Sequence, residues 1–211
     1  MTSSSSDSRN SSHAHDWWHE FGPYAHLRRL EILRKLVSGR MSSSALDVGC
    51  GTGMLKMMGL SKIVGIDLRN GQEVTVLASA EYLPFRDQSF QLVFAGEVIE
   101  HLDAPRRALR DWVRVLENGG SMIISTPNGL LVSRSWNPDH RHMLAPGDLT
   151  KTLARLGLRV NYARGFFTGL ISGRRVFRWI PFDTVKMTLL RLPVPLSLSY
   201  DLFISAEKIR D

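Results

Sequence analysis

The chain has 211 residues, one cysteine, 43% hydrophobic residues and a formal net charge of +7. This length is enough for one full three-layer α/β core and leaves little for a second domain, so a single domain is expected. A lone cysteine excludes an internal disulfide and fits a reducing cytoplasm, and no uninterrupted apolar stretch predicts a transmembrane segment or a signal peptide.

Residues 1–20 are predicted to be a disordered tail, because serine dominates their first half and few apolar groups are available for burial. The end of this tail contains His13, His15, Trp17, Trp18 and His19. Two interpretations stay open here, a metal or aromatic cluster and a segment that folds over a ligand site. Leucines then recur at helical spacing from Tyr24 to Val37, and Ser38-Gly39 ends this predicted helix.

The most informative segment is an apolar strand at Ala45–Val48 that breaks into a glycine-rich turn and then opens a helix. Its glycines are Gly49, Gly51 and Gly53. Such glycines allow backbone angles closed to other residues and let a ligand approach the main chain beside the positive end of a helix. A dinucleotide fingerprint would place its third glycine at Met54 instead. The spacing therefore indicates a nucleotide-like ligand without a pyrophosphate.

Acidic residues end the first two predicted strands. Asp47 lies two residues before the first glycine, where it is expected to order the loop and supply negative potential. Asp67 follows the strand Lys62–Ile66, and a carboxylate in this place suits the two hydroxyls of a ribose. Cys50 lies inside the glycine loop, where we interpret it as a small loop residue rather than a nucleophile.

Strands and helices continue to alternate along the rest of the chain, which predicts a mostly parallel sheet covered by helices. Asp103 is expected to cap the first helix after the fourth strand, and Asn118-Gly119-Gly120 to turn the chain into the fifth strand. The predicted strands are Val74–Leu77, Phe90–Phe94, Ser121–Ser125, Leu158–Tyr162 and Leu202–Ala206, and the predicted helices are Ala104–Leu116 and Pro146–Gly157.

The glycine loop with its preceding acid resembles motif I of the class I S-adenosylmethionine-dependent methyltransferases. The segment from Ser79 to Phe90 is similar to the stretch that these enzymes write as D-A-E-x-L-P-F-x-D-x-S-F-D. The resemblance is to type 11/23 methyltransferases and implies a Rossmann-like fold with seven strands, helices on both faces and an antiparallel last strand. It implies one methyltransferase domain at 21–211, with a cofactor-binding core at 45–128 and a variable acceptor-side region at 129–198.

The same resemblance implies a set of residues around S-adenosylmethionine. The set comprises Asp47, Gly49, Cys50, Gly51, Gly53, Asp67, Leu68, Ser79, Ala80, Glu81 and Glu97. The chain departs from the family pattern in two places. Ser79 replaces the acid that accepts from the adenine amino group, so adenine binding is expected to use the Ala80 amide. The helix between the second and third strands has shrunk to the turn Arg69-Asn70-Gly71, which should open one wall of the cofactor cleft.

A second motif, from Glu97 to Leu102, follows the fourth strand. It resembles the E-V-[IV]-E-H stretch of ubiquinone-biosynthesis O-methyltransferases and of small-RNA 3′-terminal 2′-O-methyltransferases. The resemblance implies a Mg²⁺ or Mn²⁺ site formed by Glu97, Glu100, His101 and His140, with His142 in reserve, and a catalytic group of His101, Glu100 and His140. A metal-free alternative stays open, in which the motif starts a helix and His101 is at most a general base.

The methyl acceptor is less well defined. Between Lys151 and Arg191 the chain has nine Lys or Arg residues, one acid and several aromatic residues. This pattern fits a solvated basic face, a peripheral contact with an anionic membrane, a phosphorylated glycan precursor, or nucleic acid, although no RNA-binding module is evident. We therefore expect a cytoplasmic enzyme that methylates a hydroxyl, or less favourably a nitrogen or carbon, of a small or lipid-linked molecule. The alternatives are an RNA ribose 2′-O-methyltransferase and a non-catalytic cofactor-binding subunit.

Overall fold

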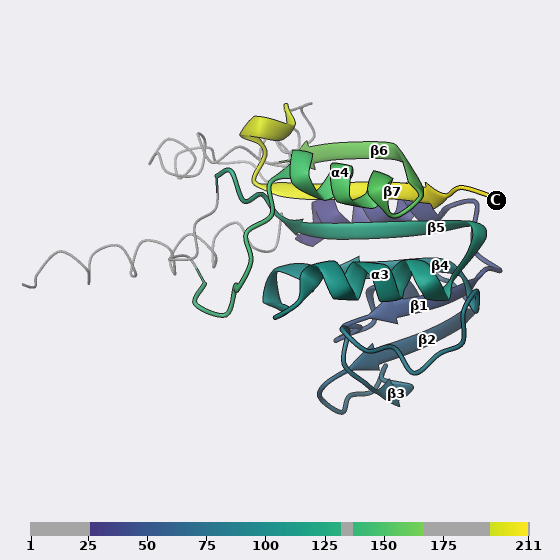
Figure 1. Cartoon of the computed structure of the whole chain (residues 1–211). Helices are drawn as coiled ribbons and strands as arrows, with labels where there is room; N and C mark the ends of the chain where they lie inside the picture. The colour runs from purple at the N-terminus through teal and green to yellow at the C-terminus, as the bar shows by residue number, and fades with distance from the viewer. Residues whose placement is uncertain (1–25, 132–136, 167–194, 211) are drawn as a thin grey trace, which may run out of the picture.

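A computed structural model of the protein describes residues 26–131, 137–166 and 195–210 (Figure 1). Seven strands form one sheet in the order β3-β2-β1-β4-β5-β7-β6. Strands β1 to β5 pair in parallel, and β7 is antiparallel to both of its neighbours, β5 and β6. The strands are β1 (Ser44–Val48), β2 (Lys62–Asp67), β3 (Val76–Leu77), β4 (Phe90–Gly96), β5 (Leu116–Pro127), β6 (Leu158–Phe166) and β7 (Asp201–Lys208). The predicted Rossmann-like fold class is confirmed.

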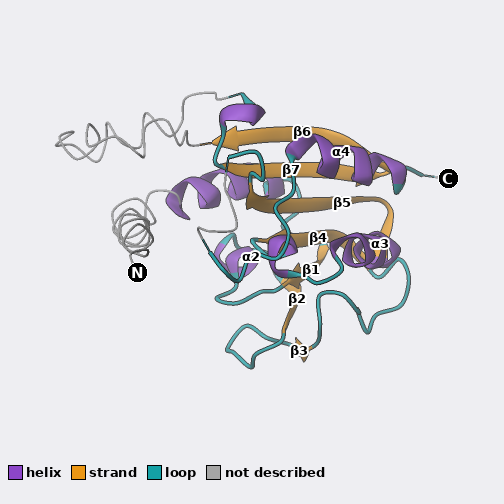
Figure 2. Ribbon diagram, turned by 60° about the vertical axis from the view of Figure 1, so that its left-hand side comes forward, coloured by secondary structure: helices purple, strands orange, loops and turns teal. Residues whose placement is uncertain are grey.

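Helices cover both faces of the sheet (Figure 2). The described helical elements are residues 26–37, α2 (Met54–Met57), η1 (Ile99–His101), α3 (Pro105–Val115), α4 (Pro146–Arg155) and η4 (Leu196–Leu198). Helices α3 and α4 lie on one face, whereas residues 26–37 and α2 lie on the other. No helix in the described part of the chain is long and apolar enough to cross a membrane.

The central strands are apolar on both faces because successive side chains point to opposite sides of the sheet. In β4, Val93 packs in the core under α3 and α4, while Leu92 and Phe94 pack under the helix at 26–37. Trp112 of α3 is fully buried in the first core, and its indole N–H donates to the Ala80 carbonyl at 2.8 Å. Through this bond α3 holds the segment between β3 and β4 against the sheet.

Several predicted boundaries are wrong, and tertiary contacts explain them. Strand β5 begins at Leu116, which the sequence pattern placed in a helix, because Leu116 pairs with Phe90 of β4. The predicted turn around Gly119, with φ +77°, lies inside β5 as an irregularity, after which pairing resumes between Leu92 and Ser121. Strand β5 therefore begins earlier than the predicted Ser121 and contains one irregular stretch around Gly119.

The expected cap at Asp103 is also wrong. The N-cap of α3 is Ala104, which makes no side-chain cap hydrogen bond, and Pro105 fills the first turn. The Ala104 N–H instead donates to Glu81 Oε1 at 2.9 Å, and the Asp103 carboxylate pairs with Arg141. Glu81, which is distant in sequence, thus accepts the backbone N–H at the start of α3, and Asp103 instead contacts Arg141.

The turn predicted at Arg69-Asn70-Gly71 replaces a helix between β2 and β3, as expected, since no helix lies between these strands. The predicted tail at 1–20, with its histidine and tryptophan cluster, lies outside the described residues. So does most of the aromatic and basic stretch after Phe166, together with residues 132–136 of the acceptor-side region.

Candidate active site

The carboxyl ends of the parallel strands meet at one edge of the sheet, at the left of Figure 1. The glycine loop follows β1, Asp67 ends β2, and Glu97 follows β4. Chain order reverses at β1, which neighbours β2 on one side and β4 on the other. Open α/β sheets bind ligands at such a switch point, where two adjacent loops diverge to opposite faces. The topology therefore places both sequence motifs at a ligand-binding edge.

The glycine loop is packed too closely for larger residues at two positions. Gly49 has φ +62°, and a Cβ there would lie 2.5 Å from Val98 Cγ2. Gly53 has φ +78°, and a Cβ there would lie 2.6 Å from Glu73 Cγ. Both positions thus combine a left-handed backbone with a close side-chain contact. The first contact joins the loop to the residues after β4, so the two motifs are in direct contact.

Asp47 lies beneath this loop and is only 2% exposed. Its carboxylate accepts the N–H of Leu55 in α2 at 3.5 Å, as expected for a residue that orders the loop. Burial raises the pKa of Asp47 to about 7, while the Leu55 bond lowers it and the nearby charge of Asp67 raises it further. The carboxyl therefore changes charge near neutral pH, directly under the loop.

Replacing Asp47 with asparagine should stabilise the protein more at pH 8 than at pH 5. The folded-state pKa of about 7 exceeds the ordinary value, so the folded chain keeps a proton that the unfolded chain has lost. The stability that this group contributes is therefore present at low pH and is lost as the pH rises toward 7. The difference in free energy of unfolding between Asp47→Asn and wild type should shift by about 2–3 kcal/mol between the two pH values.

Denaturant unfolding of both proteins at each pH measures this shift. Asp87→Asn is the matched control, since the Asp87 side chain is 71% exposed, and its difference from wild type should vary by less than about 0.5 kcal/mol. A pH-independent difference for Asp47→Asn would contradict the raised pKa.

Asp67 faces the glycine loop. Its Oδ2 accepts the N–H of Gly51 at 3.2 Å, and its Oδ1 accepts the N–H of Arg69 at 3.1 Å. Leu68, the next predicted cofactor contact, is 77% exposed. Each carboxylate oxygen can accept further hydrogen bonds, so this geometry leaves Asp67 able to receive a pair of hydroxyl groups.

Cys50 behaves as a structural loop residue. Burial, followed by the charges of Asp47 and Asp67, raises the pKa of the thiol to about 11. The Sγ donates to the Glu73 carbonyl at 3.5 Å, and the Glu73 side chain pairs with Lys56 at 2.8 Å. The segment that replaces the missing helix therefore folds against the glycine loop, and a neutral thiol there is a poor nucleophile.

On the expected adenine side, the Ser79 hydroxyl accepts the N–H of Glu81 at 3.2 Å. The Glu81 carboxylate in turn accepts from Ala104 at the start of α3. The three residues Ser79, Ala80 and Glu81 are thus fixed by contacts to their own turn and to α3. Their roles toward a cofactor stay predictions.

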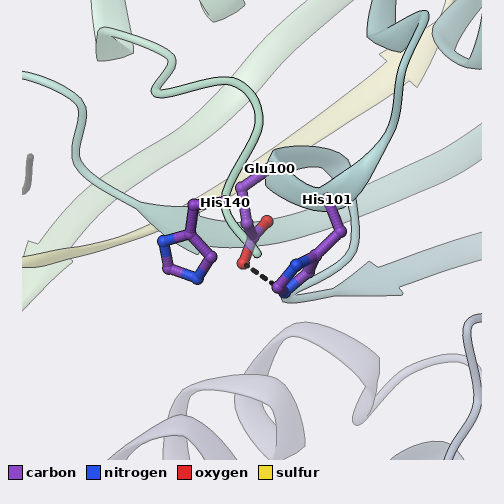
Figure 3. A group of neighbouring side chains, drawn as sticks. All are labelled: Glu100, His101 and His140. Carbon is purple, nitrogen blue, oxygen red and sulfur yellow. Dashed lines mark ion pairs between the residues drawn. The ribbon is translucent and has the colours of Figure 1, made fainter. Parts of the chain in front are cut away.

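Three of the four predicted metal or catalytic residues come together at the same edge. Figure 3 shows Glu100 between the imidazole rings of His101 and His140. One ligand atom from each residue lies within 4.8 Å of the others. The ring centroids are 4.9 Å apart, and Glu100 Oε1 lies 4.0 Å from His101 Nε2. The three residues join η1 to the loop before α4.

Glu100 is a buried acid, 1% exposed, whose Oε2 accepts from the Thr126 hydroxyl at 3.0 Å. Its Oε1 has no hydrogen-bond partner among the residues that the structure describes. Burial and then the charge of Glu97 hold its pKa well above the usual range. Burial, together with the neighbouring His101, lowers the pKa of His140. A histidine with a lowered pKa, beside a carboxyl oxygen that has no hydrogen-bond partner among the described residues, is suited to a cation or a polar acceptor group.

Backbone contacts fix the orientation of this group. The Glu100 carbonyl accepts the N–H groups of Arg141 at 2.7 Å and His142 at 3.0 Å, which docks the loop onto η1. His101 Nδ1 lies 3.1 Å from the Asp139 carbonyl, so this nitrogen must carry the proton to bond there. His101 Nε2 is then the basic nitrogen and faces Glu100. The reserve residue, His142, lies outside the group and contacts the Asp103 carbonyl instead.

Glu97, the fourth predicted ligand, lies outside this group of three. Its Oε2 accepts from Arg29 at 2.9 Å, and its Oε1 accepts from the Ser125 hydroxyl at 3.0 Å. Its own φ is +58°, uncommon for a residue other than glycine. Burial raises the pKa of Glu97 to about 7, although the Arg29 charge opposes this. Both of its oxygens are thus engaged within the fold.

Arg29 and Asp201 belong to this arrangement, and the sequence analysis missed both. The Arg29 guanidinium donates to Asp201 Oδ1 at 3.0 Å as well as to Glu97. Burial opposes the charged form of Arg29, but Asp201 and Glu97 outweigh it and raise its pKa. Arg29 is one of several basic residues on its helix, and Asp201 is 172 positions away. No local sequence signal distinguishes either residue.

Comparison with known proteins agrees with this fold. Residues 46–124 match a family model described as a methyltransferase domain. The match covers less than half of the chain. Together with the sheet topology, the relatives and the solved structures below, it supports the predicted class I S-adenosylmethionine-dependent methyltransferase.

Several relatives are individually similar to the chain. It is 26% identical to a mitochondrial ubiquinone biosynthesis O-methyltransferase of Dictyostelium discoideum, over 56% of this chain and 51% of that protein. It is 29% identical to a probable S-adenosylmethionine-dependent methyltransferase of Mycolicibacterium smegmatis, over 67% and 62%. A ubiquinone biosynthesis O-methyltransferase of Rickettsia bellii is 26% identical over 81% and 86%. The chain thus spans less than two thirds of the length of the first two relatives.

Among solved structures, a methyltransferase from Thermotoga maritima superimposes with a TM-score of 0.67 at 18% identity, over 92% of this chain and 94% of that one. A second, from Archaeoglobus fulgidus, gives 0.58 at 21% identity, over 85% and 94%. At these sequence identities the similarity to the two solved structures concerns the fold alone.

Proposed function

We propose that this protein transfers a methyl group from S-adenosylmethionine to a hydroxyl oxygen of a small or lipid-linked acceptor. The observation that carries the proposal is the group of Glu100, His101 and His140 at the sheet edge that also holds the glycine loop. Relatives named as ubiquinone biosynthesis O-methyltransferases support an oxygen acceptor.

The residues of the glycine loop suit the methyl donor. S-adenosylmethionine carries an ammonium, a sulfonium and a ribose diol, so it favours acids where a pyrophosphate favours bases. Asp47 lies under the loop and Asp67 faces it, and the tight contacts at Gly49 and Gly53 hold the backbone in place. These features support binding of the donor between the ends of β1 and β2.

His101 is the preferred general base. Its Nε2 can take the proton of the acceptor hydroxyl, since its Nδ1 already bonds the Asp139 carbonyl. Glu100 Oε1 lies 4.0 Å from this nitrogen. The acceptor oxygen then forms a bond to the methyl carbon, the carbon–sulfur bond breaks, and its electron pair stays on sulfur. The fold chiefly supplies alignment for this in-line displacement.

A divalent metal also fits these side chains, because Glu100 Oε1 lacks a hydrogen-bond partner within the described residues and two imidazoles adjoin it. Glu100, His101 and His140 would hold Mg²⁺ or Mn²⁺ here, and the ion would lower the pKa of a bound hydroxyl. In that arrangement Glu97 stays with Arg29 rather than serving as a fourth ligand. Calorimetric titration with Mn²⁺, with and without a chelator, separates the metal-dependent and metal-free versions.

Replacing Asp67 with alanine should weaken binding of S-adenosylmethionine and S-adenosylhomocysteine by about 10- to 150-fold. Charge-assisted hydrogen bonds to the ribose contribute about 1.5–3 kcal/mol, and the methyl side chain of alanine could not accept them. Isothermal titration calorimetry measures the loss. Asp87→Ala, which changes an exposed acid outside the loop, is the matched control and should bind both ligands as wild type does.

Two results would contradict the proposal. Absence of S-adenosylmethionine binding by the wild type would remove the donor, and binding without methyl transfer to any hydroxyl acceptor would favour a non-catalytic subunit. The acceptor screen should contain phenols, polyprenyl-linked phenols and short RNA ends. Transfer to RNA alone would move the assignment to a ribose 2′-O-methyltransferase.

A further inference from the structure

Helices α3 and α4 lie on the sheet face opposite the helix at 26–37 (Figures 1 and 2). Residues of both helices line a groove, which we call the basic groove. Its volume is about 640 Å³. Leu144 contributes a partly exposed apolar surface to its lining, while the neighbouring Leu109 and Leu149 are buried in the core where both helices pack on the sheet. Ala104 and His142 line the end that adjoins the candidate active site. The groove is therefore a concave surface with an apolar patch at Leu144, separate from the glycine loop.

Positive charge gathers along both walls of the groove. The exposed basic residues are Arg106, Arg107 and Arg110 from α3, and Lys151 and Arg155 from α4. Asp148 is the one acid among the lining residues. Within the described ranges, none of these five basic residues forms an ion pair, although Arg107 lies 3.7 Å above the ring of Tyr82. By contrast, Arg114 at the far end of α3 pairs with both Asp87 and Asp111.

The spacing of these charges is unfavourable for the isolated fold. Arg106 and Arg110 are four residues apart on α3, and Lys151 and Arg155 are four apart on α4. Residues at this spacing lie on the same side of a helix, so each wall carries a row of like charges that repel one another. Among the described residues that line the groove, the one acid that could offset these charges is Asp148, which belongs to α4 itself. An anionic partner would relieve this repulsion.

We propose that the basic groove binds an acidic segment of a partner protein that places an apolar side chain against Leu144. A concave surface with an apolar patch accepts protruding side chains better than it accepts a flat bilayer. Among the described residues that line it there is no Phe, Tyr or Trp, so single-stranded nucleic acid would lack a stacking platform. Arginine-rich walls suit carboxylates, which they can bind with paired hydrogen bonds. The proposal is independent of methyl transfer.

The test uses a fluorescein-labelled peptide of about twelve residues, with leucines at helical spacing and glutamates elsewhere. We expect micromolar binding at low salt in fluorescence anisotropy, weakened at least about tenfold by the double variant Arg110→Glu/Arg155→Glu. This variant places an acid in each like-charged row, so it should not impair folding. A peptide with serine in place of leucine should also bind at least about tenfold more weakly.

The matched control is Arg34→Glu/Lys35→Glu, which changes the same charge at exposed positions of the helix at 26–37. It should retain peptide binding within about twofold. The proposal is overturned if the peptide does not bind, or if both double variants lose binding equally. It is also overturned if oligouridylate or phosphatidylglycerol vesicles bind more tightly than the peptide and show the same dependence on Arg110 and Arg155.

Discussion

Replacing Arg29 with methionine is expected to lower the free energy of unfolding by about 3–5 kcal/mol. Arg29 is buried, and its guanidinium lies 2.9 Å from Glu97 and 3.0 Å from Asp201. Methionine would preserve much of the volume but leave both carboxylates without their cation in a region of low exposure. Removing one partner of a buried ion pair lowers the free energy of unfolding by more than the intact pair contributes to it, because the remaining buried charge is uncompensated.

Arg34→Met is the matched control for this prediction. Arg34 lies on the same helix and is exposed, so its replacement should change the free energy of unfolding by less than about 0.5 kcal/mol. Urea denaturation of both variants provides the comparison. A loss for Arg29→Met no greater than for Arg34→Met would show that the ion pairs do not hold this helix to the sheet.

The mechanism predicts a partial rescue. Combining Arg29→Met with Glu97→Gln and Asp201→Asn removes every charge of the cluster, so no uncompensated charge stays buried. The triple variant should recover at least half of the stability lost by Arg29→Met, because replacing a whole buried ion cluster is often nearly neutral. If the triple variant were less stable than Arg29→Met, the stability lost by Arg29→Met would be assigned to packing rather than to uncompensated charge.

Replacing His101 with asparagine should lower kcat for methyl transfer to a hydroxyl acceptor by about 10²- to 10⁴-fold. This expectation rests on the proposed function and holds for both versions of the mechanism, since His101 Nε2 faces Glu100 and His140. Affinity for S-adenosylhomocysteine should change by less than about twofold, because the glycine loop is untouched. Initial rates at saturating donor and a phenolic acceptor, with calorimetry, measure the two effects.

His142→Asn is the control for His101→Asn. His142 is a nearby histidine whose Nε2 contacts the Asp103 carbonyl and which lies outside the group of three. We expect the kcat of the His142→Asn variant to fall by less than about threefold. Equal losses in the two variants would contradict the assignment of His101. Binding of Mn²⁺, followed by electron paramagnetic resonance, should weaken at least about tenfold in His101→Asn if the metal-dependent version holds.

The sequence predicted the fold class well because its signals are local. Short apolar runs identified the central strands, and the glycine spacing after Val48 identified the ligand-binding turn. The short turn after Asp67 and the antiparallel last strand are also as expected. Boundaries were less accurate where pairing competes with propensity, as at Leu116, which joins β5 because Phe90 lies beside it.

The candidate site was predicted in part. Glu100, His101 and His140 converge as expected, because η1 follows β4 and the loop before α4 docks on the Glu100 carbonyl. Glu97 lies apart from them, since Arg29 and Ser125 occupy its two oxygens. The choice of His140 with His142 in reserve also agrees with the structure, since His140 joins the group and His142 contacts the Asp103 carbonyl.

The sequence by itself determined which residues form strands, where the glycine turn lies and which acids and histidines follow the strand ends. These features depend on backbone angles and on hydrophobic periodicity over a few residues, which neighbouring positions specify. Only the tertiary structure decided the partners of Arg29, the separation of Glu97 from the histidines, and the facing charged rows of α3 and α4. Those depend on helix docking and strand order, which bring together charged residues that lie far apart in the chain.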